Sequence, residues 1–144
     1  METLPILEDL TNEQFEKLLT ICEKKSFPPD FVIYKEGGRS LDMYILTEGA
    51  LLVTLWGKEI GRIFPISVVG EIGLFTGEPR TATVTTLTNC SLLRITKDDL
   101  FKLFEEDKDL HIRFQNGMIR DMADKLKQTN EVIAKLKSKV EKKL

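Results

Sequence analysis

Two charged side chains near the middle of the chain, Glu71 and Arg80, are close enough in sequence to bind one ligand together. Glu71 directly follows Gly70, and Arg80 lies beyond the turn sequence Gly77-Glu78-Pro79. Arginine can hold a phosphate through two parallel hydrogen bonds. Glutamate repels a phosphate, so beside one it is suited to accept a hydrogen bond from a sugar hydroxyl. The two residues therefore indicate a ligand with a hydroxyl next to a phosphate, as in a ribose cyclic phosphate.

The backbone around these charges also suits an anion. The flanking glycines allow N–H groups to approach a ligand closely, and a short helical turn opening near Gly70 would point its positive end at the same place. The alternative for the two charges is a structural ion pair between Glu71 and Arg80 beneath a hairpin.

Residues 69–84 resemble the phosphate-binding cassette of the cyclic-nucleotide-binding domain family. This family includes catabolite-activator-type regulators, the regulatory subunits of cyclic-AMP-dependent kinase, and nucleotide-gated channels. Its pattern reads Gly-Glu-hydrophobic-small-Leu, a variable turn, and then Arg-small-Ala-Thr/Ser-Val. The pattern stands here as Gly70-Glu71-Ile72-Gly73-Leu74 and Arg80-Thr81-Ala82-Thr83-Val84.

The resemblance implies that Glu71 binds the ribose 2′-hydroxyl and that Arg80 binds the cyclic phosphate, with support from the N–H groups of Ile72 and Ala82. The ligand-binding residues that it implies are Val53, Gly70, Glu71, Ile72, Gly73, Arg80, Thr81, Ala82, Thr129 and Asn130. The chain departs from the family pattern at Pro65-Ile66-Ser67, which replaces a Gly-Asp turn, and at Val69, which replaces an aromatic residue. Proline can form the turn, so the departure concerns the floor of the pocket and the affinity.

The elements that must position this cassette are mainly strands. A capping-box sequence at Thr11-Asn-Glu-Gln14 predicts an N-terminal helix that ends near Lys25. From Phe31 onward the apolar period becomes that of strands. The predicted strands are Phe31–Lys35, Met43–Glu48, Ala50–Trp56, Glu59–Phe64, Thr81–Thr86 and Ser91–Ile95. The pattern alone predicts an all-β core flanked by helices; the resemblance, over about 27–130, implies a double-stranded β-helix, or jelly roll.

The C-terminal part of the chain is predicted to be helical. A helix capped by Thr96 runs through Phe104, and a longer one follows to the end of the chain. Apolar residues recur along the long helix at the alternating spacing of a coiled-coil seam. The seam consists of Ile119, Met122, Leu126, Thr129, Ile133, Leu136 and Val140. We expect this helix to form a parallel homodimer rather than to fold back on its own domain. The chain then divides into a β-roll at 1–107 and a hinge and dimerisation helix at 108–144.

Thr129 is the polar member of the seam, and by itself it indicates a threonine bonded to its own backbone that sets the register. The run 123–130 resembles the central helix of catabolite-activator-type proteins, where a Thr-Ser pair contacts the adenine. Asn130 replaces the serine here, and its amide suits the adenine edge. Thr81 follows the cassette arginine at a position that is associated with guanine recognition in channels and cyclic-GMP-dependent kinases. Cyclic-AMP binders also tolerate a threonine there, so the Thr129-Asn130 pair favours cyclic AMP as the ligand, and cyclic GMP stays open.

Composition sets the class of protein. With 144 residues, 42% of them hydrophobic, and a net charge of −2, the chain is expected to be one globular module without a general nucleic-acid surface. No apolar run is long enough to span a membrane and no export signal is visible, so we expect a cytoplasmic protein. Cys22 and Cys90 read as small hydrophobes on a helix and a strand. His111, expected at a helix surface, is the only histidine, and no metal site, cofactor or catalytic group is expected around it.

The sequence therefore predicts a cyclic-nucleotide sensor that is not an enzyme and has no DNA-binding domain. Ligand occupancy would set the position of the C-terminal helix, which would act on an unknown downstream protein. The alternative is a ligand-free member of the family that serves as a dimerisation and protein-interaction module.

Overall fold

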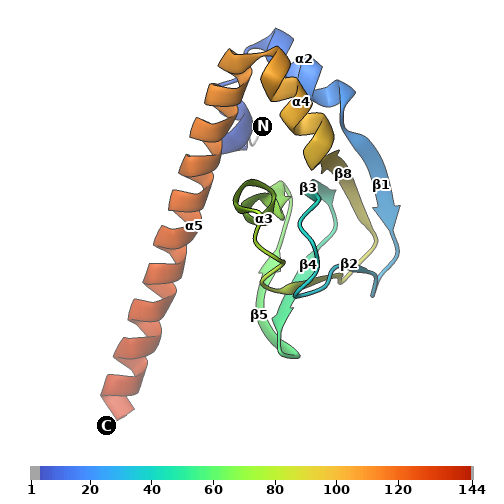
Figure 1. The fold of residues 1–144 in the computed structure, drawn as a ribbon. Helices are drawn as coiled ribbons and strands as arrows, with labels where there is room; N and C mark the ends of the chain where they lie inside the picture. The colour runs from blue at the N-terminus through green and yellow to red at the C-terminus, as the bar shows by residue number, and fades with distance from the viewer. Residues whose placement is uncertain (1–3, 144) are drawn as a thin grey trace.

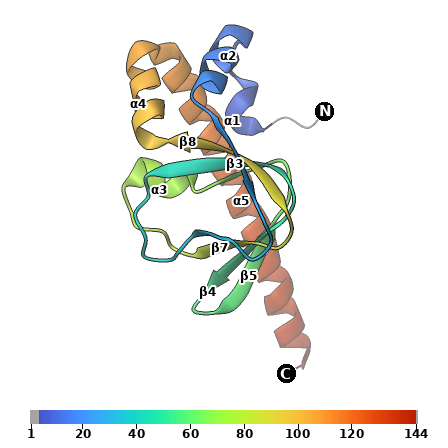
Figure 2. The same cartoon turned by 90° about the vertical axis from the view of Figure 1, so that its right-hand side faces the viewer.

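The computed structural model describes residues 4–143, and in this part of the chain two four-stranded antiparallel sheets form a sandwich flanked by helices (Figures 1 and 2). Residues 1–3 and 144 lie outside the described residues. They are the two ends of the predicted segments 1–107 and 108–144. The strands are β1 (Glu23–Phe27), β2 (Val32–Tyr34), β3 (Asp42–Glu48), β4 (Leu51–Leu55), β5 (Lys58–Ile63), β6 (Ser67–Val69), β7 (Thr83–Thr86) and β8 (Cys90–Thr96). The helices are α1 (Pro5–Glu8), α2 (Asn12–Thr20), α3 (Glu71–Thr76), α4 (Lys97–Glu106) and α5 (Lys108–Lys143).

The strand order is β1-β8-β3-β6 in one sheet and β2-β7-β4-β5 in the other. Strand β3 lies between β8 and β6, with Ile45 opposite both Leu93 and Val68. Strands β6 and β7 belong to different sheets, and the segment between them carries α3. The cassette therefore lies where the chain crosses from one sheet to the other.

The predicted strands are present, with ends moved by one or two residues, but β1 and β6 were not predicted. The helix predicted to end near Lys25 was wrong at that end, because α2 ends at Thr20. The next charged residues form β1, which pairs with β8 along the edge of its sheet. Charged side chains are typical of edge strands. The capping box is confirmed: Thr11 Oγ1 accepts from the N–H of Gln14 at 3.2 Å, and Gln14 Oε1 accepts from the N–H of Thr11 at 3.0 Å.

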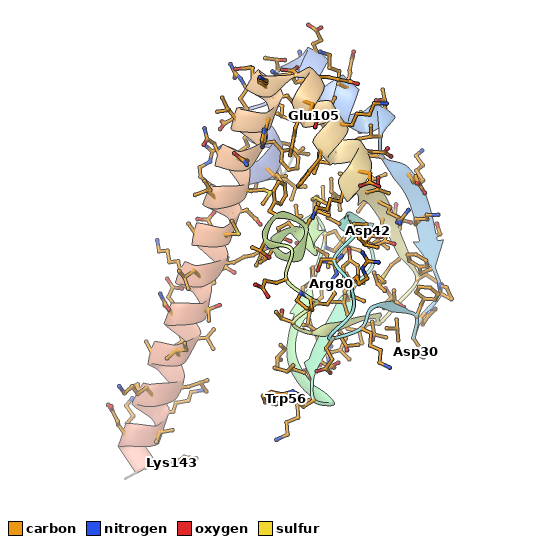
Figure 3. The ribbon with its side chains drawn as sticks, in the orientation of Figure 1. Asp30, Asp42, Trp56, Arg80, Glu105 and Lys143 are labelled. Atoms are coloured by element: carbon orange, nitrogen blue, oxygen red, sulfur yellow. The ribbon has the colours of Figure 1, made fainter. Side chains whose placement is uncertain are left out.

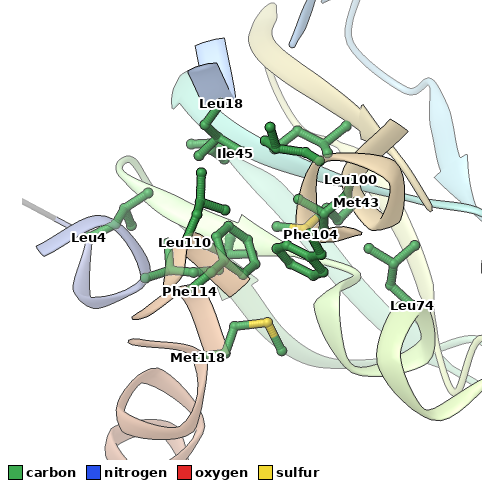
Figure 4. Close-up of a cluster of buried hydrophobic side chains, with 14 residues drawn as sticks. Leu4, Leu18, Met43, Ile45, Leu74, Leu100, Phe104, Leu110, Phe114 and Met118 are labelled. Carbon is green, nitrogen blue, oxygen red and sulfur yellow. The ribbon is translucent and has the colours of Figure 1, made fainter. Parts of the chain in front are cut away.

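Two clusters of buried side chains form the core. The first joins helices to the β3 side of the sandwich (Figure 4) and contains Leu4, Ile6, Leu18, Met43, Ile45, Val68, Leu74, Ile95, Leu100, Leu103, Phe104, Leu110, Phe114 and Met118. The second lies between the sheets and contains Tyr34, Tyr44, Leu46, Leu51, Val69, Val84, Cys90 and Leu92. Cys90 is thus a buried strand residue, as predicted, whereas Cys22 lies just after α2 and is only partly buried.

Helix α4 begins at the predicted cap, where Thr96 Oγ1 accepts from the N–H of Asp99 at 3.2 Å. Helix α5 follows after Asp107 and is packed only along its first part. His111, predicted at a helix surface, is instead partly buried and stacks on Phe104, with ring centroids 4.1 Å apart. From residue 123 to 143 every residue of α5 is exposed, and the helix extends away from the sandwich (Figure 1).

The packed part of α5 is held by the N-terminal helix α1. Gly117 faces α1 so closely that a Cβ at this position would lie 2.5 Å from Pro5 O and 2.6 Å from Ile6 Cα. Arg120 forms an ion pair with Asp9 at 2.8 Å beside this contact. Glycine is therefore needed at 117 because two backbones approach each other there.

Candidate ligand-binding site

The site begins with α3, the short helical turn that the sequence predicted near Gly70. Gly70 (φ 85°) and Gly77 (φ 77°) bound this turn in the left-handed region, which favours glycine. A Cβ on Gly70 would also lie 2.7 Å from Arg80 Nη1 and from the ring of Tyr34. The glycine therefore serves both the turn and the approach of two side chains. Glu71, the first residue of α3, is 4% exposed.

Arg80 is also buried, and most of its donors are already used. Nη1 donates to Gly70 O at 2.8 Å, and Nη2 donates to the carbonyl oxygen of Asp42 and to Asp42 Oδ1, the latter at 3.1 Å. The guanidinium carbon lies 3.5 Å from the centroid of the Tyr34 ring. Nε is buried and has no hydrogen-bond partner among the described residues. The uncommitted donors of Arg80 within residues 4–143 are therefore Nε and the second N–H of Nη1.

Asp42, the first residue of β3, holds Arg80 through its carboxylate and its carbonyl oxygen. Its carboxylate also accepts from Arg94 Nε at 2.7 Å, and Figure 3 shows Asp42 next to Arg80. This hydrogen bond raises the pKa of Arg94. The hydroxyl of Tyr34 donates to the carbonyl oxygen of Asp42 at 3.0 Å. Burial and the negative charge of Asp42 raise the pKa of Tyr34, so its phenol stays protonated as a donor.

Glu71 is tied to the last helix rather than to Arg80. Lys125 Nζ lies 2.8 Å from Glu71 Oε1 and 3.0 Å from Asp121 Oδ2, and it donates to Val68 O at 3.4 Å. Burial alone would lower the pKa of Lys125, but the charges and hydrogen bonds of Glu71 and Asp121 outweigh it and raise that pKa. Glu71 and Arg80 thus each have another ionic partner, which differs from the alternative of a structural ion pair between them.

A cavity of about 240 Å³ lies between the cassette, the sheet of β4 and Lys125. Eight of the predicted site residues line it, namely Val53, Gly70, Glu71, Ile72, Gly73, Arg80, Thr81 and Ala82. Other walls are supplied by Tyr34, Ile63, Val68, Val69, Glu78, Pro79, Val84 and Lys125. The cavity therefore combines an apolar floor with one buried carboxylate and one buried guanidinium, a set of groups suited to a small polar anion that also carries an apolar part.

Thr129 and Asn130 do not line this cavity. Both are exposed on α5, and Thr129 Oγ1 donates to the carbonyl oxygen of Lys125 at 3.0 Å. This bond matches the simpler reading of Thr129 as a threonine bonded to its own helix. The adenine contact remains a prediction, which needs either movement of α5 or a second chain.

Sequence reasoning missed Tyr34, Asp42 and Lys125. Tyr34 and Asp42 stood in segments that matched the early strands of the family, but nothing in their spacing indicated a contact with Arg80. Lys125 lay within the run 123–130 that drew attention for its base contact. Nothing in the spacing of the sequence linked Lys125 to its partner Glu71, which lies 54 residues earlier in the chain.

Within residues 4–143, no helix is long and apolar enough to cross a membrane. The same residues contain no group of three or more His, Cys, Asp or Glu side chains that could hold a metal ion.

Comparison with known proteins shows what this chain is similar to. A family model described as the cyclic nucleotide-binding domain matches residues 24–107. The chain is 27% identical to an uncharacterized NTE family protein of Mycobacterium tuberculosis, over 90% of this chain and 22% of the relative. It is 29% identical to a cGMP-dependent protein kinase of Eimeria tenella, over 83% of this chain and 12% of the relative. The chain therefore spans less than a quarter of the length of these two relatives.

A solved structure supports the same fold. The catabolite activator protein of Thermus thermophilus matches with a TM-score of 0.75 and 17% identity, over 92% of this chain and 63% of that chain. The likeness includes α5, since it extends over nearly the whole chain. The predicted jelly roll with an N-terminal helix and a long C-terminal helix is confirmed.

Proposed function

This chain belongs to the cyclic nucleotide-binding domain family, and from that premise we propose that it is a non-catalytic sensor of cyclic AMP. The observation that carries the proposal is the cavity at the cassette, where the buried Glu71 and Arg80 face one ligand-sized space. Arg80 Nε supplies an unpaired donor for a phosphate oxygen. A buried donor without a partner is costly, so a ligand that satisfies it gains affinity.

The assignment of cyclic AMP over cyclic GMP rests on α5. Thr129 and Asn130 offer a hydroxyl and an amide to a base, and they lie one helical turn beyond Lys125, which already reaches the cavity. Thr81 lines the cavity and would bond the phosphate with its hydroxyl. Cyclic GMP is the second candidate for the same site.

The ion pair between Lys125 and Glu71 supports coupling between the ligand and α5. A ribose hydroxyl that donates to Glu71 shares the carboxylate with Lys125, and so it changes how firmly α5 is held at the cavity. Binding then shifts the equilibrium between two positions of α5 by the difference in contact energy. In this proposal, 1–107 is the ligand-binding unit and 108–144 is the hinge and output helix.

We propose a homodimer through the exposed face of α5. Ile119, Leu126, Ile133, Leu136 and Val140 are 55–62% exposed there, whereas Met122, the other apolar member of the predicted seam, packs against the core of its own domain. The residues beside this seam favour parallel helices. A parallel pair in register would place Lys125 of one copy opposite the uncharged Asn130 of the other, so no like charges meet there.

One observation favours a second function, that of a ligand-free dimerisation and protein-interaction module. Glu71 and Arg80 already have ionic partners within the protein, so both buried charges of the cavity are paired without a ligand. In either case we place the protein in the cytoplasm, with an unidentified downstream protein as its partner.

Isothermal titration with cyclic AMP, cyclic GMP and 5′-AMP tests the proposal. We expect micromolar or tighter binding of cyclic AMP, weaker binding of cyclic GMP and no binding of 5′-AMP. Glu71→Gln should weaken binding because it replaces the charged acceptor for the ribose hydroxyl with a weaker neutral one, and Glu59→Gln on exposed β5 is the matched control. Absence of heat and of thermal stabilisation with all three nucleotides would favour the ligand-free module.

A further inference from the structure

Tyr34 is a wall residue of the cavity, and both its ring and its hydroxyl contact the groups that hold Arg80. Its ring lies 3.5 Å from the guanidinium carbon, within the range of a strong cation–π contact. Its hydroxyl donates to the carbonyl oxygen of Asp42 at 3.0 Å, and the same carbonyl accepts from Arg80 Nη2. Gly70 completes the arrangement, because a Cβ there would touch both the Tyr34 ring and Arg80 Nη1.

These contacts fix the plane of the guanidinium as well as its position. An arginine side chain has several rotatable bonds. Hydrogen bonds to Nη1 and Nη2 would still allow the guanidinium plane to tilt, and stacking on the Tyr34 ring restrains that tilt. With Nη2 fully used by Asp42 and Nη1 bonded once, to Gly70 O, the donors left for a ligand are Nε and the second N–H of Nη1. The geometry differs from the two-bond grip that arginine usually offers a phosphate.

Resting on the proposed function, we infer that Tyr34 is a positioning residue for phosphate recognition. Its ring holds Arg80 so that the phosphate of the ligand meets the N–H groups left free on Nε and Nη1, since Nη2 is taken by Asp42. Tyr34 does this by stacking, and its hydroxyl contributes by holding the carbonyl of Asp42 in place.

The test compares variants that keep or remove the ring. Tyr34→Phe keeps the stack and loses the hydroxyl; Tyr34→Leu loses the stack. Tyr44→Leu is the matched control, because Tyr44 is buried in the same cluster with its ring centroid 5.7 Å from that of Tyr34. Affinities are measured for cyclic AMP and, in competition, for adenosine, which lacks the phosphate.

We expect Tyr34→Leu to weaken cyclic AMP binding about tenfold relative to Tyr44→Leu, as loss of a desolvated cation–π contact predicts. Adenosine binding should change less than about twofold, and Tyr34→Phe should retain most of the affinity. Equal losses for cyclic AMP and adenosine, or an unchanged affinity in Tyr34→Leu, would overturn the inference while leaving the sensor intact. A wild-type protein that binds no cyclic nucleotide would overturn the proposed function and this inference together.

A second measurement needs no variant at Tyr34 and so does not depend on how that variant folds. The N–H resonances of Nε and Nη1 of Arg80 are assigned in proton–nitrogen spectra by their loss in Arg80→Lys. Addition of cyclic AMP should shift at least one of these resonances, and adenosine should leave both in place. Resonances that both stay unmoved in the cyclic AMP complex would show that the free donors of Arg80 do not meet the phosphate.

Discussion

Lys125 Nζ lies 2.8 Å from Glu71 Oε1, so the last helix of the chain is joined to the wall of the cavity by one ion pair. The Glu71 side chain is 5% exposed and that of Lys125 is 45% exposed. The Glu71 carboxylate has little contact with solvent and so relies on Lys125 to balance its charge, whereas the Lys125 ammonium can also be hydrated. Any change at Glu71 reaches α5 at this point, near the start of the exposed part of the helix.

Lys125→Met should lower the free energy of unfolding by about 1 kcal/mol, a small value because solvent screens the half-exposed lysine. The raised pKa of Lys125 means that its contribution is complete below the ordinary value of 10.5 and is lost as the pH rises through the folded-state value. Chemical denaturation from pH 7 upward should show the difference from wild type shrinking only above that pH. Lys127→Met is the control, and an equal effect there would contradict the assignment.

Arg80→Ala should weaken cyclic AMP binding by about 2–5 kcal/mol, or roughly 30-fold to several thousand-fold. It also leaves Asp42 with Arg94 as its remaining ionic partner, so the melting temperature should fall as well. Titration calorimetry measures the first effect and thermal melting the second. Arg62→Ala, whose exposed ion pair with Glu59 lies on β5, serves as the control. A loss of affinity below about threefold would mean that Arg80 does not bind the phosphate.

Thr129→Ala should reduce the preference for cyclic AMP over cyclic GMP about fivefold, the value of one hydrogen bond to the base. The fold should be unaffected because Thr129 is exposed. Thr20→Ala is the control and should leave the preference unchanged. It removes a comparable hydroxyl, which donates to the carbonyl oxygen of Lys17 within its own helix at 2.6 Å. Competition binding with both nucleotides decides the matter, and an unchanged ratio would remove the base-reading role.

Ile133→Glu should raise the dissociation constant of the homodimer at least about tenfold, because it places a charge in the apolar seam. Sedimentation velocity over a range of protein concentrations measures this change. Lys135→Glu alters the charge on the same helix outside the seam and should leave association nearly intact. A wild-type chain that sediments as a monomer at all concentrations would rule the dimer out.

Gly117→Ala should lower the free energy of unfolding by about 1–3 kcal/mol. In an ordinary exposed helix this change would stabilise by about 1 kcal/mol. Here the new methyl would meet the backbone of Pro5 and Ile6, which cannot move aside as a side chain can. Gly61→Ala in β5 is the control, since a Cβ there has no neighbour within 4 Å. Urea denaturation of both variants measures the difference.

Local sequence was sufficient for the cassette. The glycines, the short helix and the positions of Glu71 and Arg80 depend on a run of residues that interact with one another, so their order in the chain carried the information. The partners of these charges come from segments 38 and 54 residues away. Such contacts depend on tertiary packing, and neither periodicity nor spacing predicts them.

The same distinction explains the errors in the fold. Strand β1 has a charged sequence that continues the polar face of the preceding helix, and only its pairing with β8 makes it a strand. Helix α1 is four residues long, too short to show a helical period, and it is fixed by burial of Ile6 against α5. Both elements depend on partners that come late in the chain.

The close contact at Gly117 makes α5 a lever with its fulcrum near one end. From that contact to Lys143 the helix runs about 26 residues, or about 39 Å at 1.5 Å per residue. A rotation of about 10° at the fulcrum would therefore carry the far end through about 7 Å. A displacement of an ångström at Lys125, close to the pivot, is thus multiplied severalfold at the tip.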